Sequence, residues 1–176
     1  MTIKDIPAEW QKVLGELQER YSHVVIGGGA IRDLENDRPI KDVDIWVIDD
    51  TVLKGSSPVF GADIEMSCAA SSGASLKNIS RVEKLSQYGI DFDVIFTHSL
   101  KDIDDLLEYF LDNISRVAYD GNRIIRHASY IVGHNTKTIV VDWEKNNTNS
   151  EGRVEKRINK LKGKYSDYTL VEKNRL

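Results

Sequence analysis

Residues 26 to 46 read IGGGAIRDLENDRPIKDVDIW, and this stretch decides how the rest of the chain is interpreted. Three glycines, residues 27–29, follow a short apolar run, and glycines let backbone N–H groups approach an anion closely. Arg32 follows within one helical turn and brings a fixed positive charge suited to phosphate oxygens. Asp42 and Asp44 alternate with apolar residues in a strand pattern, which places both carboxylates on one face.

Together these features favour the transfer of a phosphoryl or nucleotidyl group with a divalent metal. Two carboxylates on one strand face offer the hard oxygen ligands that Mg²⁺ prefers, and the glycines and arginine offer a phosphate cradle. Each feature alone has a plainer explanation: a tight turn, a surface cation and the edge of a sheet. Their combined spacing is what points to chemistry.

Two other phosphate-binding motifs fit this stretch less well. The P-loop pattern G-x-x-x-x-G-K-[ST] is absent. The glycines begin like a dinucleotide-binding fingerprint, and Asp49 lies about 20 residues further on, where a ribose-binding acid would be. However, Arg32 stands where that motif needs glycine, and Pro39 stops the intervening helix after about two turns. The dinucleotide-binding fold is therefore the weaker alternative.

The spacing of apolar residues predicts the elements on both sides of this stretch. We expect helices at residues 7–21 and 30–36, and strands at residues 23–26 and 42–48. Residues 55–78 are rich in Ser, Gly and Ala and are typical of a loop, whereas residues 81–86 and 90–97 resemble a hairpin. The pattern is mixed α and β, without a regular βαβ alternation.

The C-terminal half continues the mixed pattern. Ser99 and Asp102 resemble a capping box that opens a helix, and Thr148 with Glu151 resembles a second one. Further strands are expected at residues 113–119 and 139–141. In the last helix, Arg153, Lys156, Arg157 and Lys160 share one side, while Val154, Ile158 and Leu161 share another that should dock on the domain.

Composition adds limits on class and location. The chain has 176 residues and a net charge of −4, but residues 151–176 hold eight Lys/Arg against four Asp/Glu. We therefore expect a catalytic domain at residues 1–148 and a basic helical tail at residues 149–176. The single cysteine, Cys68, excludes an internal disulfide. No apolar run is long enough for a membrane helix and the N-terminus lacks a signal-peptide core, so we expect a cytoplasmic protein without a membrane partner.

The same central stretch resembles the first motif of the DNA-polymerase-β-like nucleotidyltransferase superfamily. The likeness is to the catalytic head of bacterial-type tRNA CCA-adding enzymes and poly(A) polymerases, whose pattern is G-G-x-V-R-D, then L-L-G-R, then D-x-D. The matching positions are Gly28, Gly29, Ile31, Arg32, Asp33, Arg38, Asp42 and Asp44. The departure is at residues 35–37, where Glu-Asn-Asp replaces Leu-Leu-Gly. The resemblance implies a mixed α+β nucleotidyltransferase palm, a small twisted sheet backed by helices.

Further along, the likeness is looser. In the segment 90–96, Asp93 falls at the position of the family's third acidic residue, and Asp91, two residues earlier on the same strand face, is the alternative. Residues 111–121 are a degenerate match to the family segment R-R-D-F-T-I-N-A, with its leading arginines missing. Asp112 and Arg116 stand as its remnants. About 55 residues remain after this segment, so the chain resembles a free-standing catalytic head, a layout similar to compact phage-encoded nucleotidyltransferases.

The resemblance also implies an activity and its participants. It implies transfer of a nucleoside monophosphate from an NTP to a hydroxyl with release of pyrophosphate, with Mg²⁺, or Mn²⁺ in its place, held by Asp42, Asp44 and Asp93. Gly28, Gly29, Arg32 and Asp112 would bind the nucleotide. The acceptor would be an RNA 3′ end such as that of tRNA, reached through the basic tail. A nucleotide-binding module without turnover, and an enzyme that modifies a protein or a small molecule, are the alternatives.

Overall fold

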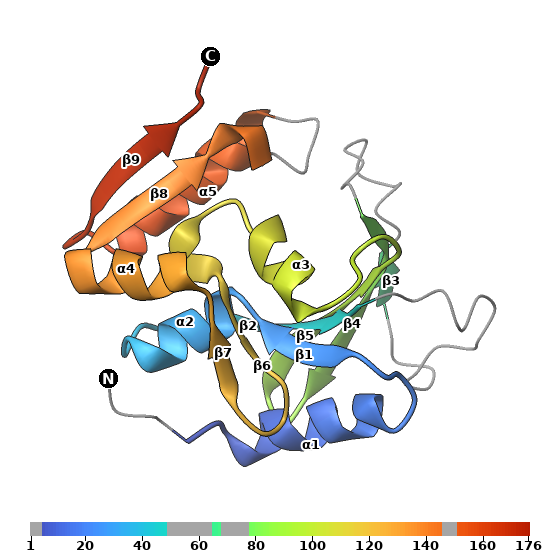
Figure 1. Cartoon of the computed structure of the whole chain (residues 1–176). Coiled ribbons are helices and arrows are strands. Elements are labelled where there is room, and N and C mark those ends of the chain that lie inside the picture. Colours follow the sequence, from blue (N-terminus) through green and yellow to red (C-terminus); the bar gives the residue numbers. More distant parts are fainter. Residues whose placement is uncertain (1–4, 49–64, 68–77, 146–150) are drawn as a thin grey trace.

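A computed structural model of the chain describes residues 5–48, 65–67, 78–145 and 151–176 (Figure 1). A sheet of seven strands in the order β3-β4-β5-β2-β1-β6-β7 forms its centre, and β8 and β9 form a second, two-stranded sheet. The elements are α1 (Ala8–Gln18), β1 (Val24–Gly27), α2 (Gly29–Glu35), β2 (Asp42–Val47), β3 (Glu65–Ser67), β4 (Ile79–Gln87), β5 (Ile90–Thr97), α3 (Ile103–Tyr109), η3 (Asn113–Ser115), β6 (Val117–Tyr119), β7 (Ile124–Arg126), α4 (Ala128–Thr136), β8 (Thr138–Asp142), η4 (Trp143–Lys145), α5 (Glu151–Lys164) and β9 (Thr169–Lys173).

The central sheet is mixed, as the sequence predicts. Strands β2 and β5 pair in parallel, whereas β1 pairs antiparallel with both β2 and β6, and β4 pairs antiparallel with β5. A dinucleotide-binding fold needs consecutive parallel strands joined by crossover helices. Because β1 and β2 are antiparallel neighbours, that alternative is excluded. The predicted hairpin is confirmed: β4 and β5 join through Tyr88 and Gly89, both at positive φ.

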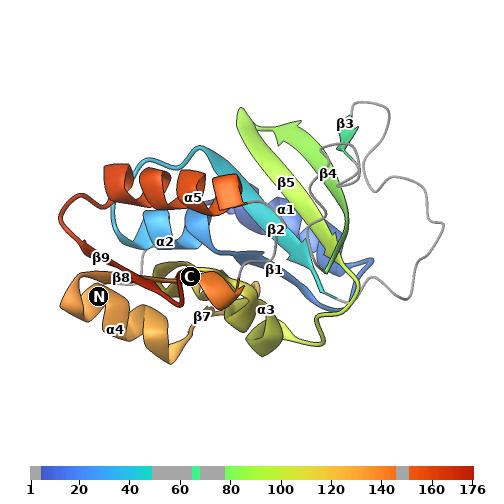
Figure 2. The ribbon, with the colours of Figure 1, turned by 90° about the horizontal axis from the view of Figure 1, so that it is seen from above.

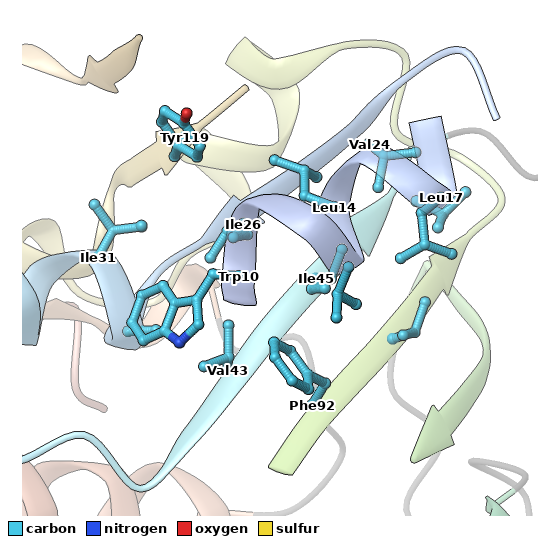
Figure 3. Packing of buried hydrophobic residues seen from close by; sticks show 14 of the residues in the cluster. Trp10, Leu14, Leu17, Val24, Ile26, Ile31, Val43, Ile45, Phe92 and Tyr119 are labelled. Carbon is cyan, nitrogen blue, oxygen red and sulfur yellow. The ribbon is translucent and has the colours of Figure 1, made fainter. Parts of the chain in front are cut away.

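The main hydrophobic core lies between α1 and one face of this sheet (Figure 3). The alternation along β2 sends Val43 and Ile45 to that face, where they meet Trp10 and Leu14 of α1 and Phe92 of β5. Apolar residues recur every second position along the strand and every three to four positions along the helix. Each element therefore turns one apolar face toward the other, and that face is buried. The residues between them, Asp42, Asp44 and Trp46, therefore belong to the opposite face.

Two smaller clusters complete the packing. On the second face of the sheet, Trp46 and Ile95 pack against Leu106 and Leu107 of α3. A third cluster joins α5 to β8, and its buried side chains are Val154, Ile158, Leu161, Ile139 and Val141. In two perpendicular views, α4, β8, α5 and β9 gather on the α2 side of the sheet, away from β3 and β4 (Figures 1 and 2). The prediction that the apolar stripe of the last helix docks on the domain is confirmed.

Four details differ from the sequence-based expectation. Within the stretch expected to be a loop, residues 65–67 form β3. The N-cap of α3 is Asp102 rather than Ser99: its carboxylate accepts from the Asp105 N–H at 2.9 Å, while Ser99 bonds to Asn78. Asp102 and Ser99 are both good N-cap residue types, so residue type alone does not show which of them caps the helix. Thr148 lies outside the described residues.

The other two differences concern strands. The stretch 113–119 begins as a 3-10 turn, because Asn113 bonds to the backbone of β8: its Oδ1 accepts from the Val140 N–H at 2.7 Å. Only Val117–Tyr119 is a strand. The tail contains the predicted helix, α5, but then continues as β9, which pairs in parallel with β8. Among the described residues, no helix is long and apolar enough to cross a membrane.

Candidate nucleotide and metal site

The predicted acidic residues lie on two neighbouring strands. In the parallel pair β2–β5, Asp42 faces Asp91 and Asp44 faces Asp93. Paired residues of adjacent strands share a sheet face, so all four side chains belong to the face opposite α1. The structure therefore brings Asp42, Asp44 and Asp93 to one side of the sheet, as the resemblance implies, with Asp91 on the outer end of the row.

This crowding of carboxylates changes their acidity. Burial raises the pKa of Asp44 to about 7, and the negative charges of Asp42 and Asp93 add to the rise. Arg157 and Lys160 of α5 act in the opposite direction. Burial also raises the pKa of Asp93, although Lys84, 4.0 Å from its carboxylate, lowers it. Burial therefore disfavours the charged form of both carboxylates, and this is a condition that a bound cation relieves.

The donor set fits a hard divalent cation. All the candidate ligands are carboxylate oxygens, the type that Mg²⁺ and Mn²⁺ prefer. Asp42 and Asp44 are the residues that would hold it, with Asp93 beside them on β5. As the side chains stand in the described part of the chain, no group of three His, Cys, Asp or Glu residues is close enough together to hold a metal ion. A three-acid site would therefore need the side chains of Asp42, Asp44 and Asp93 to move closer together.

The glycine turn connects β1 to α2 beside these acids. Gly28 has a φ of +78°, a conformation that residues with a β-carbon rarely adopt, and its N–H donates to the Val117 carbonyl at 2.8 Å. The Gly28 amide is thus used inside the fold. Gly29 is the first residue of α2, where backbone N–H groups have no partner within the helix. Of the two predicted amides, the one suited to a ligand is that of Gly29.

A cleft of about 440 Å³ opens between the acids, the glycine turn and α5. Its polar lining includes Gly28, Gly29, Asp44, Asp112, Arg153 and Arg157. Its apolar lining includes Trp46, Ile95 and Phe110. A second hollow of about 410 Å³ lies on the other side of the acids, where Asp42, Asp91 and Asp93 are flanked by Lys41 and Lys84. The row of carboxylates therefore separates two hollows.

Arg32 does not line this cleft. Its guanidinium is 2% exposed and donates to Asp33 at 2.7 Å, to Ser115 at 2.9 Å and to the Tyr165 hydroxyl at 3.2 Å. Lys164 joins the same group, since its Nζ lies 2.5 Å from the Asp33 carboxylate. This buried network links α2 to η3 and to the end of α5. The geometry makes Arg32 a residue that fixes the glycine turn relative to α5 rather than one that faces a phosphate.

Asp112 and Arg157 form the polar wall opposite the glycine turn. The Asp112 carboxylate is buried and accepts from Arg157 Nε at 3.1 Å and from the Ser115 hydroxyl at 2.6 Å. Burial alone would raise the pKa of Asp112, but the charges of Arg157 and Arg32 outweigh it and lower the pKa. The sequence predicts Arg153 and Arg157 only as part of one basic side of the last helix, a side suited to guiding an acceptor. The helical spacing does not show that these two arginines turn toward the cleft, because that depends on the docking angle of α5.

No protein-family model matches the chain, and no curated protein matches it in sequence. Its fold does match solved structures. Against a CCA-adding enzyme complexed with ATP, the TM-score is 0.58 at 15% identity, covering 95% of this chain and 40% of that one. Against the Bacillus stearothermophilus CCA-adding enzyme in complex with CTP, it is 0.54 at 17% identity, covering 94% and 42%. Against a tRNA-processing enzyme in an apo form, it is 0.57 at 15% identity, covering 80% and 38%.

These comparisons confirm the predicted fold. The chain shares its fold with part of each of these enzymes and spans about two fifths of their length. At these identities the likeness concerns the fold alone.

Proposed function

We propose that the protein is a nucleotidyltransferase that moves a nucleoside monophosphate from an NTP to an acceptor hydroxyl and releases pyrophosphate. The observation that carries this proposal is the row Asp42, Asp44 and Asp93 across two parallel strands, in which Asp44 lines a cleft together with the glycine turn and two arginines. A cleft that offers both carboxylates and arginines suits a substrate that is both metal-binding and polyanionic.

In this proposal each group of residues at the site has a distinct role. A divalent cation on Asp42 and Asp44 would supply positive charge to the triphosphate and lower the pKa of the attacking hydroxyl. The Gly29 N–H, at the start of α2, donates to a phosphate oxygen, and the close backbone approach depends on the missing side chains of Gly28 and Gly29. Arg157, oriented by Asp112, adds positive charge to the same phosphates. Arg32 fixes the glycine turn relative to α5 through its buried hydrogen bonds to Ser115 and Tyr165.

The proposed acceptor is an RNA 3′ end, such as that of tRNA. The support is the charge on α5: Lys156 and Lys160 are exposed, and the cleft-lining arginines belong to the same helix. Lys160 acts electrostatically on Asp44, so the basic side of α5 lies near the acids. A polyanionic chain that follows these lysines would arrive at the carboxylate row, where the hydroxyl is needed.

A second candidate is a nucleotide-binding module without turnover. The observation that favours it is the position of Asp93, whose carboxylate lies toward Lys84 instead of closing a three-acid cluster with Asp42 and Asp44. A binder needs the glycine turn and arginines but tolerates an open metal site, whereas turnover needs the third carboxylate to take part.

The test is incubation of the protein with each α-labelled NTP and Mg²⁺ or Mn²⁺, in the presence of separate pools of RNA and protein. We expect label on RNA and release of pyrophosphate, and neither with Asp44→Ala. Label on a protein would replace RNA as the acceptor. NTP binding without transfer of label to any acceptor would favour the binding module.

A further inference from the structure

The indole N–H of Trp46 is a buried donor without a partner. The Trp46 side chain is 5% exposed, and no acceptor in the described part of the chain bonds to its Nε1. Trp143, by contrast, donates its Nε1 proton to Glu172 at 3.0 Å. Buried indole N–H groups usually find a partner, because an unpaired buried donor is costly. The exception at Trp46 therefore needs an explanation.

The unpaired edge of the indole faces the glycine turn. A β-carbon added to Gly27 would lie 3.1 Å from Trp46 Cδ1 and 3.4 Å from Nε1. Trp46 is also two residues from Asp44 on the same strand face, and it lines the same cleft as Gly28 and Arg157. Its N–H thus lies close to the glycine turn, on a side chain that lines the same cleft as Asp44.

Two aromatic rings pack against Trp46, those of Tyr109 and Phe110, and Phe110 is the one that also reaches the glycine turn. The Phe110 ring stacks edge-on against Trp46 with 5.4 Å between centroids, and its Cζ would lie 3.3 Å from a β-carbon on Gly28. Phe110 is the residue after the last turn of α3, in extended backbone, and it is only half-buried. Its ring therefore occupies the space above the glycine turn and is held mainly by apolar contact.

We propose that the Trp46 indole N–H is a hydrogen-bond donor to a phosphate oxygen of the nucleotide that this cleft binds, reached when the nucleotide displaces the Phe110 ring. This inference rests on the proposed function, since it assigns one more interaction to the same substrate. The bound oxygen would satisfy a donor that the free protein leaves unpaired, so the new bond costs no existing hydrogen bond.

The direct test is NMR of the ¹⁵N-labelled protein. The chain has three tryptophans and hence three indole N–H signals, and the Trp46→Phe variant identifies the one that belongs to Trp46. We add each NTP with Mg²⁺, then inorganic tripolyphosphate, then a nucleoside without phosphate. We expect the Trp46 proton signal to move downfield with NTP and with tripolyphosphate and to stay in place with the nucleoside. The signal of Trp143 should not move.

Binding affinity gives the second readout. Trp46→Phe keeps an aromatic ring but removes the N–H, and we expect it to weaken NTP binding about tenfold, which corresponds to about 1.4 kcal/mol. Its urea midpoint should fall, because the smaller ring leaves a cavity beside Leu106 and Leu107, so NTP affinity is compared without urea, where both proteins are folded. Trp143→Phe is the matched control: it removes a satisfied N–H away from the cleft and should leave NTP affinity unchanged.

The outcomes separate this inference from the proposed function. If the parent binds NTP but its Trp46 signal stays in place, or Trp46→Phe binds equally well, the donor role is wrong and the proposed function stands. If the nucleoside alone moves the signal, the acceptor is not a phosphate and the inference is wrong. If the parent binds no NTP, both are overturned.

Discussion

His134 provides a quantitative test of the packing that positions α5. Its ring is 9% exposed and lies among Tyr130 of α4, 4.4 Å away between centroids, and Tyr165 and Tyr168, which follow α5. Its Nδ1 shares a 2.7 Å hydrogen bond with the Tyr168 hydroxyl. Burial lowers the pKa of His134 to about 4, and the charge of Arg32 adds to the effect. Glu35, Asp112 and the backbone of Ile114 act in the opposite direction.

The direction of the pH dependence follows from linkage. Below pH 6.5, the ordinary pKa of histidine, the unfolded chain takes up a proton that the folded chain accepts only near pH 4. The unfolded state therefore binds more protons in this window, and stability is lost as the pH falls through it. Each pH unit changes the free energy of unfolding by about 1.4 kcal/mol, so the loss is about 2 kcal/mol by pH 5 and about 3 kcal/mol in full.

The assay is urea unfolding at several pH values between 8 and 4.5, with His134→Gln as the variant. Glutamine cannot titrate, but its amide can still accept from the Tyr168 hydroxyl. We expect the parent to lose about 2 kcal/mol more than His134→Gln between pH 8 and pH 5, because all other titrating groups cancel in the difference. His98→Gln removes an exposed histidine and should follow the parent. Parallel curves for the parent and His134→Gln would refute the reasoning.

Four further predictions concern the carboxylate row, Arg32 and the basic side of α5. Asp42→Ala or Asp44→Ala should abolish turnover in the labelled-NTP assay without lowering the urea midpoint, because each removes a carboxylate from a crowded row; near-parental activity in either contradicts the metal role. Asp93→Asn should reduce turnover more than Asp91→Asn, since Asp93 pairs with Asp44 across the strands, and a reversed order would move the third acid to Asp91. Arg32→Ala should lower the free energy of unfolding by about 3 kcal/mol, because it removes a buried guanidinium that bonds to Asp33, Ser115 and Tyr165. A variant that unfolds like the parent but binds NTP weakly would restore Arg32 to a phosphate-binding role. Substitution of Lys156 and Lys160 by Glu should weaken RNA binding and leave NTP affinity unchanged. The slope of log affinity against log salt concentration should fall by about one for each phosphate that the helix no longer neutralises. An RNA affinity equal to that of the parent would exclude α5 as the acceptor surface.

The sequence predicts the acidic row well because strands have a fixed period. Once Asp42 and Asp44 alternate with core residues, their shared face follows, and the pairing with Asp93 needs only the neighbouring strand in parallel register. The hairpin β4–β5 also depends only on nearby residues, since two adjacent residues at positive φ, Tyr88 and Gly89, form its turn. These features depend on the chain a few residues to either side.

Features that depend on distant partners are not predictable in this way. Arg32 has the spacing of a phosphate-binding arginine, but its burial is decided by Tyr165, 133 residues further along the chain. Likewise, β9 forms by pairing with β8. In the sequence its residues follow the basic helix without a clear boundary, so the strand is not predicted. Contacts with distant residues outweigh the intrinsic helix or strand propensity of a segment, because most of the stability of an element comes from packing.

Helix α5 shows why the tail cannot be treated as a separate appendage in any of these experiments. Val154, Ile158 and Leu161 are buried against β8 and η3, while Arg157, between them in sequence, donates to Asp112 and Ser115 in the cleft wall. The apolar stripe fixes the rotation of the helix, and that rotation is what directs Arg157 toward the carboxylate row. A substitution such as Ile158→Ala should therefore affect two measurements together, lowering the free energy of unfolding by about 2 to 5 kcal/mol and weakening NTP binding through the displaced arginine. If NTP affinity stays at the parental value in the fraction that remains folded, the cleft does not depend on the docking of α5.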